Sequence, residues 1–268
     1  MSNANQVDHN AQAKIHIDSN NNPEKFLREN QFYDSMIVGK YCEQKHPQLA
    51  CIAYERGKCD QDFIRVCNEN NLFKNEVRYL IKRKDLQLWT TVLKKENKFS
   101  RQLIDQVVQT ALNETQNPED VNLIVKSLMA ADLQRELIEF LDKAVLKNSA
   151  FSNDKYLQNL LILTAIKADR SRLLEYVNRF NNYDASEVAN IAISSMLYEE
   201  AFAIYKKFKM NTSAISVLID NVKNLDRAQE FAERCNESAV WSLLGKAQLK
   251  AGLVEKSNAS IKKADKKT

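Results

Sequence analysis

The chain has 268 residues, of which only four are glycine and three are proline. β-Sandwiches, Rossmann sheets and TIM barrels need frequent tight turns, which these residues supply, so the shortage excludes such folds and predicts an all-α protein. The 39 basic and 35 acidic residues leave a net charge of +4, too balanced to indicate nucleic-acid or membrane binding.

The sequence is typical of a cytosolic protein. No window approaches the ~18 apolar residues that a membrane span needs, and the first residues lack the apolar core of a signal peptide. The five cysteines are an odd number in a large chain, which favours free thiols in a reducing compartment.

Helices of about 10 to 15 residues follow one another along the chain. Pro47 fits the first turn of a helix that runs to Arg56, with Gly57 past its end, and Asn117 with Pro118 fits the start of another helix. Between such points, polar loops alternate with apolar stripes that have helical spacing. Two such stripes are Leu103, Val107, Val108, Ala111 and Leu112, and then Leu137, Ile138, Leu141 and Val145.

The last third of the sequence has a regular period. Leu197, Leu225 and Leu253 each open a helix-like segment, and each lies 28 residues after the one before. Two helices and two loops fit this period, and the stretch from Trp241 to Gly245 resembles the start of a tetratricopeptide repeat. We therefore predict a right-handed α-solenoid of stacked antiparallel hairpins, about nine hairpins in a rod on the order of 80 Å long.

Six longer stretches of the sequence closely resemble the clathrin heavy chain, and the match is collinear from about Val7 to Lys263. They are Asn20–Asn30, Val38–Cys42, Leu49–Gly57, Leu103–Leu112, Leu157–Arg170 and Ala201–Phe208. The resemblance implies a segment of the distal leg that covers most of two successive clathrin repeats. It suggests disorder for residues 1–6, a first repeat over residues 7–147 that is partial at its start, and a second over residues 150–268 that is truncated at its C-terminal end. The junction is expected near Asn148 to Ser152.

The resemblance also implies what this chain lacks. The family's adaptor-binding β-propeller, its light-chain-binding proximal leg and its trimerisation region have no counterpart in the sequence. Ser257, Asn258 and Ser260 stand where the last matched hairpin of the family has an apolar helix face, so we expect that helix to lose contacts and to fray.

One cluster of residues offers a candidate metal or nucleophile site. Cys42 and His46 lie one helical turn apart, and Cys51, Cys59 and Cys67 follow. No Cys-x-x-Cys pair is present, and a free cysteine in an amphipathic helix packs as a small apolar residue. The remaining histidines, His9 and His16, lie near the N-terminus, so a Cys–His site is disfavoured.

Other polar residues are better explained by structure than by chemistry. The carboxyl pairs Glu199–Glu200 and Glu119–Asp120 are adjacent in sequence and so point in different directions on a helix. The four glycines are too scattered to form a phosphate loop. We expect the basic runs Lys82–Lys84 and Lys262–Lys267 to be solubilising surface, and five aromatics to pack between helices: Trp89, Phe140, Tyr176, Phe180 and Phe208.

The sequence therefore predicts a structural segment of a vesicle coat with no catalytic, cofactor-binding or metal-binding residue and no cofactor. The resemblance implies contacts with other clathrin heavy-chain legs, at the cytoplasmic face of coated pits and vesicles. It implies indirect membrane association through the coat, no nucleic-acid partner, and light-chain and adaptor binding only through regions outside this chain. The alternatives are a tethering subunit of the vacuolar sorting type, a truncated clathrin-like paralogue without coat activity and, as a distant third, an enzyme built on helical repeats.

Overall fold

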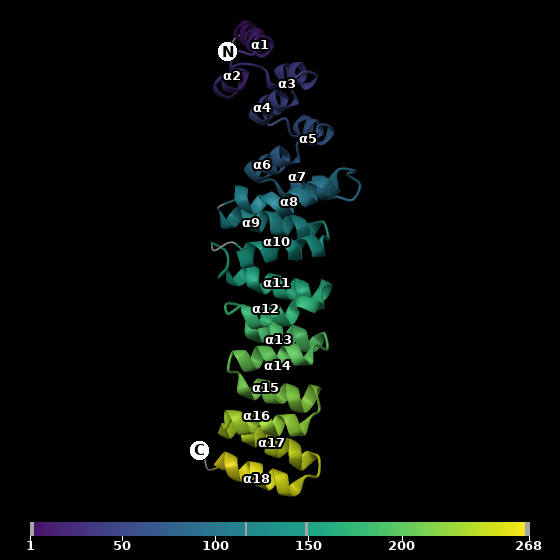
Figure 1. The fold of residues 1–268 in the computed structure, drawn as a ribbon, viewed down its shortest axis with the longest axis vertical. Helices are drawn as coiled ribbons and strands as arrows, with labels where there is room; N and C mark the ends of the chain where they lie inside the picture. Colours follow the sequence, from purple (N-terminus) through teal and green to yellow (C-terminus); the bar gives the residue numbers. More distant parts are fainter. Residues whose placement is uncertain (1–2, 116, 148–149, 266–268) are drawn as a thin grey trace. The chain divides into compact units, whose positions relative to one another are not determined.

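The computed structural model describes residues 3–115, 117–147 and 150–265, and every regular element in these ranges is helical (Figure 1). Eighteen α-helices, one 3-10 turn and one π-helical segment account for the described elements. The prediction of an all-α solenoid is confirmed. The chain divides into two compact units, residues 1–136 and 137–268, and each is described by itself.

The first unit is built from nine short helices and the beginning of a tenth. They are α1 (Asn3–Asp18), α2 (Pro23–Glu29), α3 (Ser35–Glu43), α4 (Pro47–Gly57), α5 (Asp60–Glu69), α6 (Phe73–Arg83), α7 (Leu86–Leu93), α8 (Ser100–Glu114), α9 (Pro118–Ala130) and α10 (Gln134–Lys147). Helix α3 packs on α4, α4 on α5, and α5 on α6, while α2 also contacts α4 and α6 contacts α8. Each helix is thus supported mainly by those one or two positions away in the chain.

The helix boundaries in this unit follow local chemistry. Asp34 begins α3 because its carboxylate accepts hydrogen bonds from the N–H groups of residues 36 and 37, and Asn117 caps α9 ahead of Pro118 as predicted. The prediction for Gly57 was wrong, because it is the last residue of α4 and Lys58 takes the left-handed conformation after it. Gly57 is constrained by packing instead, since a Cβ atom there would clash with the Cβ of Ser35.

The second unit comprises the rest of α10 and the elements that follow it. They are α11 (Lys155–Ala168), the 3-10 turn η1 (Arg170–Arg172), α12 (Leu173–Arg179), α13 (Ala185–Ser194), α14 (Tyr198–Lys207), α15 (Asn211–Ser216), the π segment η2 (Val217–Asn221), α16 (Leu225–Cys235), α17 (Ser238–Lys250) and α18 (Val254–Asp265). Leu197, Leu225 and Leu253 stand at the starts of α14, α16 and α18, so the 28-residue period marks the second helix of three successive hairpins.

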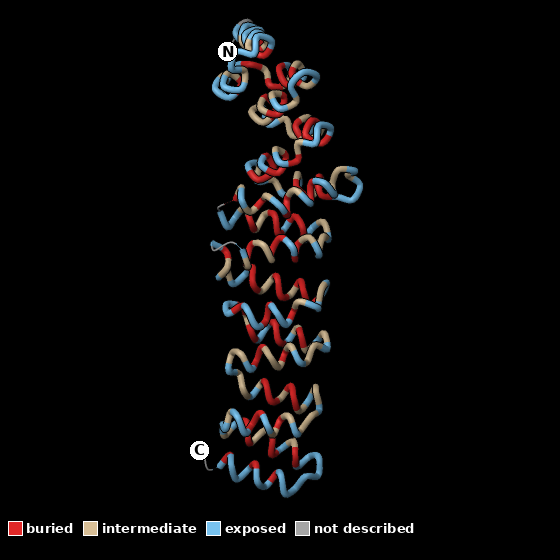
Figure 2. The backbone as a smooth tube through the Cα atoms, in the orientation of Figure 1, coloured by how far each residue is buried: buried red, intermediate tan, exposed pale blue. Residues whose placement is uncertain are grey.

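Buried residues follow the faces along which successive helices meet (Figure 2). Trp89, Phe140, Tyr176 and Phe180 are buried, and Phe208 packs edge-on against the ring of Tyr183. The prediction that these aromatics fill the space between helices is confirmed, because each large ring occupies volume that small helical residues leave open.

Helix α18 differs from the expectation that its serines would leave it without contacts. Ser257 and Ser260 are buried, and their hydroxyls donate hydrogen bonds to the Gly245 carbonyl and to Gln248 Oε1, each at 2.8 Å. Gly245 has no side chain, which lets α17 and α18 approach closely. Small polar residues therefore make a tight interface here, and that prediction was wrong.

Candidate functional site

The structure separates the cysteine and histidine residues that the sequence placed in one candidate cluster. Cys42 points into the core of the first unit, where burial raises the pKa of its thiol to about 12, whereas His46 is exposed at the start of α4. The Sγ atoms of Cys51 and Cys67 lie 3.6 Å apart within that core. Over residues 3–115, 117–147 and 150–265, no three His, Cys, Asp or Glu side chains gather to hold a metal ion.

The other two histidines pack on aromatic rings of the first unit. His9 stacks on Phe32 with ring centroids 5.0 Å apart, and His16 stacks on Phe26 at 4.4 Å. Both lie on α1, which begins at Asn3, so residues 3–6 are helical although we expected disorder there. These rings dock α1 on the segment that follows it.

One carboxylate of each pair considered for acid–base chemistry, Glu199 or Asp120, instead forms an ion pair with a residue distant in sequence. Glu199 binds Arg227, 28 residues later, with two contacts of 2.5 and 2.8 Å, and these hydrogen bonds lower the pKa of Glu199. Asp120 lies 3.0 Å from the Nζ atom of Lys84. Each carboxylate thus links its helix to a neighbouring one, and sequence-adjacent pairs such as Glu199 and Glu200 do not act together.

The basic run in α6 is also structural rather than only solubilising. Lys82 contacts Glu55 at 2.6 Å, and Arg83 binds both oxygens of Asp60 at 2.7 and 2.9 Å. The hydrogen bonds from Arg83 lower the pKa of Asp60. In the C-terminal basic run, Lys263 lies over the ring of Trp241, and residues 266–268 fall outside the described residues.

A polar constellation that the sequence analysis missed fixes the turn before α3. The Tyr33 hydroxyl donates to the Leu27 carbonyl at 2.8 Å, and the Asp34 N–H donates to Asn10 Oδ1 at 2.7 Å. The Arg56 guanidinium lies 3.9 Å from the centroid of the Tyr33 ring and donates to the Tyr33 carbonyl. One turn is thus held by α1, α2 and α4 together.

The same constellation recurs 150 residues later, in the second unit. The Tyr183 hydroxyl donates to the Val177 carbonyl at 3.2 Å, and the Asp184 N–H donates to Asn159 Oδ1 at 2.7 Å. Lys207 takes the place of the arginine and donates to carbonyls at the end of α12. The signal in the sequence was the repeated Tyr-Asp pair, which a search for catalytic residues passes over.

Glu76 is a buried ionisable residue of the first unit whose carboxylate has no hydrogen-bond partner among the described residues. Glu76 on α6 is fully buried, and neither carboxylate oxygen accepts or donates a hydrogen bond to a described residue. Burial raises its pKa to about 8, so the side chain is mainly protonated at neutral pH. It does not line the groove of this unit.

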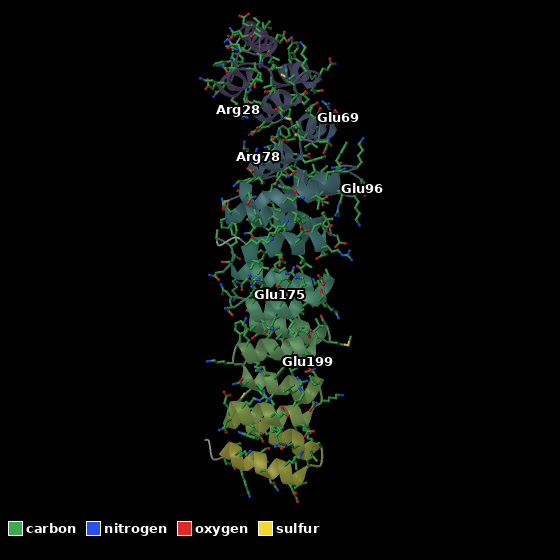
Figure 3. The ribbon with its side chains drawn as sticks, in the orientation of Figure 1. Arg28, Glu69, Arg78, Glu96, Glu175 and Glu199 are labelled. Carbon is green, nitrogen blue, oxygen red and sulfur yellow. The ribbon has the colours of Figure 1, made fainter. Side chains whose placement is uncertain are left out.

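An open groove in the first unit is lined mainly by residues of α2, α4 and α6. It has a volume of about 940 Å³. Leu49, Ile52 and Leu72 are half-buried in its lining. Arg28 and Arg78, labelled in Figure 3 on α2 and α6, also line it. The groove combines apolar and charged groups.

These features define the class of protein. Hairpins contact their neighbours in the chain, ion pairs bridge successive hairpins, and a polar turn constellation repeats at long range. The chain is a helical-repeat protein, an α-solenoid. No helix in the described ranges combines the length and the apolarity that crossing a bilayer requires.

The family follows from comparison with known proteins. The family model named Clathrin, described as a region in clathrin and VPS proteins, matches residues 2–104 and 112–255. The chain belongs to this family of clathrin heavy-chain repeats, which confirms the resemblance seen in the sequence.

Curated relatives match over nearly all of this chain. The clathrin heavy chain of Drosophila melanogaster is 65% identical over 257 residues, which are 96% of this chain and 15% of that protein. Clathrin heavy chain 2 of Homo sapiens is 62% identical over 257 residues, 96% of this chain and 16% of that protein. Clathrin heavy chain 1 of Arabidopsis thaliana is 56% identical over 260 residues, 97% of this chain and 15% of that protein. The chain thus spans about 15% of the length of the relatives it matches.

Proposed function

We propose that this chain is a leg segment of a clathrin-type coat, with a mechanical role in lattice assembly during vesicle transport and endocytosis. The observation that carries the proposal is 65% identity to a clathrin heavy chain along 96% of the chain, on a solenoid whose hairpins support one another in sequence. Such a fold presents a large surface for its size, and many weak contacts on it become strong together while each stays reversible.

The proposal includes partners and location. The partners are other heavy-chain legs, with light chains and adaptors binding regions that lie outside this chain. The segment would work at the cytoplasmic face of coated pits and vesicles. Two repeats over residues 7–147 and 150–268 are supported by the two polar constellations, which stand 150 residues apart.

We also propose that the segment does no chemistry itself. The carboxylates weighed as catalytic pairs hold neighbouring helices, and Cys42 has a thiol kept protonated by burial. A tethering subunit of the vacuolar type shares the family description, but the names of the curated relatives favour the coat.

A chimera tests the coat proposal. The matched segment of the Drosophila heavy chain is replaced by this chain in an otherwise unchanged protein, which is purified as its trimer and placed under assembly conditions. We expect cages that sediment as those of the unmodified protein do, with closed lattices in electron micrographs. A chimera that is folded and trimeric but stays in the supernatant would contradict the proposal.

A further inference from the structure

The groove of the first unit is lined by basic side chains, most of which are paired with glutamates. Lys74, Arg78 and Lys82 are spaced four residues apart on α6, and so form one basic row along that helix. Arg78 and Lys82 line the groove directly. Across the apolar lining, α2 and the turn before α4 contribute Arg28, Lys45 and His46. Basic groups therefore flank the apolar residues on both sides.

Two of the three acidic residues of the groove are less exposed than the bases that they bind. Lys82 and Arg78 keep 64% and 45% of their side-chain surface exposed, whereas their partners Glu55 and Glu114 keep only 30% and 23%. Glu114 is shared between Lys74 and Arg78, at 3.8 and 2.8 Å, so one carboxylate faces two cations. Only Glu24, the partner of Arg28, is the more exposed member of its pair. Four basic and three acidic side chains line the groove, so its net charge is small and positive, and the bases of two pairs are the more exposed members.

We propose that this groove binds an acidic peptide segment whose carboxylates alternate with apolar side chains. Its apolar side chains would cover Leu49, Ile52 and Leu72, which remain partly exposed in the lining. Its carboxylates would share Arg78 and Lys82, because exposed ion pairs are weak and can accept a second carboxylate at small cost. The concave shape favours a peptide over a flat anionic bilayer.

This inference is independent of the coat proposal, because it concerns one surface of the first unit and can be tested on the chain alone. The probe is a fluorescein-labelled peptide in which glutamates alternate with leucines, and binding is measured by fluorescence anisotropy. We expect saturable binding that weakens as salt is raised, and no binding of the same peptide with lysine in place of each glutamate.

Two variants locate the binding site. The double substitution Arg78→Gln with Lys82→Gln is expected to weaken peptide binding about tenfold. The matched control, Lys94→Gln with Lys95→Gln, changes two exposed lysines of the same unit outside the groove and should leave binding unchanged. Leu49→Ala tests the apolar lining, and circular dichroism checks that each variant is folded.

Three outcomes would overturn the proposal. The first is an equal loss of binding in the groove variant and its control, and the second is equal binding of the lysine peptide. The third is binding of vesicles that contain phosphatidylserine, sensitive to Arg78→Gln with Lys82→Gln, without binding of the acidic peptide. That result would assign the basic row to membranes.

Discussion

Glu199 and Asp120 link neighbouring helices through ion pairs, whereas Glu76 has no hydrogen-bond partner among the described residues. Its carboxylate is buried without a partner and its pKa is raised from 4.5 to about 8. The folded state therefore binds more protons than the unfolded state between these values. By linkage, its contribution lowers stability as pH rises through this window, and the penalty is absent below about pH 4.5.

Replacing Glu76 by leucine should therefore stabilise the protein at neutral and alkaline pH. The stability difference between variant and wild type should grow with pH by up to about 1.4 kcal/mol per unit between pH 5 and pH 8. Urea denaturation at several pH values measures it, with exposed Glu96→Gln as the control. A difference that does not change with pH would show that Glu76 is not protonated in the folded state.

Lys207, unlike Glu76, has hydrogen-bond partners, because its ammonium group binds backbone carbonyls at the end of another helix. Its Nζ atom donates to the carbonyls of Val177, Asn178 and Phe180 at the end of α12, and burial lowers its pKa. Lys207→Met leaves these acceptors without a charged donor and should cost about 1.5 to 3 kcal/mol of stability. Thermal or urea unfolding measures it. Lys206→Met, at an exposed neighbour, should cost under about 0.5 kcal/mol, and equal losses would refute the role.

At the scale of helices, the sequence predicted positions better than contacts. Apolar spacing and the few prolines placed α4, α8, α9 and α10, because amphipathicity and capping are local properties. The period marked by Leu197, Leu225 and Leu253 located three hairpins. The contact between α17 and α18 could not be predicted this way. Ser257 is buried and binds the Gly245 carbonyl, where a Cβ atom would meet Ile261 of α18, and this fit depends on the packing of two segments.

This interface gives a test at the same scale. If Ser257 merely replaced a lost apolar contact, leucine at this position would stabilise α18. The observed fit predicts the reverse, because Ser257→Leu adds volume against the Gly245 backbone and should destabilise by about 1 to 3 kcal/mol. Ser257→Ala, which loses only a hydrogen bond, should cost about 1 kcal/mol. A more stable leucine variant, measured by urea unfolding, would contradict this packing.

At the candidate site, too, contacts between helices could not be predicted from the sequence. Cys42 and His46 are one turn apart in sequence, yet the helix ends between them, so one is buried and the other exposed. The groove with its basic row could not be predicted, because its residues come from five helices, α2, α4, α5, α6 and α8, and the loops between them. The Tyr-Asp pairs at Tyr33 and Tyr183 were visible in the sequence, but their partners lie 20 to 30 residues away and needed the fold.

At the scale of the whole molecule, the central claim is that each helix is stabilised mainly by its neighbours in the chain. A globular core couples distant segments, whereas a solenoid loses stability only near the site of damage. Such local loss of stability suits a scaffold in which some contacts break while others are kept.

Hydrogen exchange after the substitution Gly57→Ala tests this claim most directly. The added Cβ would meet Ser35 and should disturb the contact between α3 and α4. We predict that amide protection falls in α3, α4 and their adjoining helices, while α16, α17 and α18 keep the protection that they have in the wild type. A fall of similar size in all helices would contradict the account.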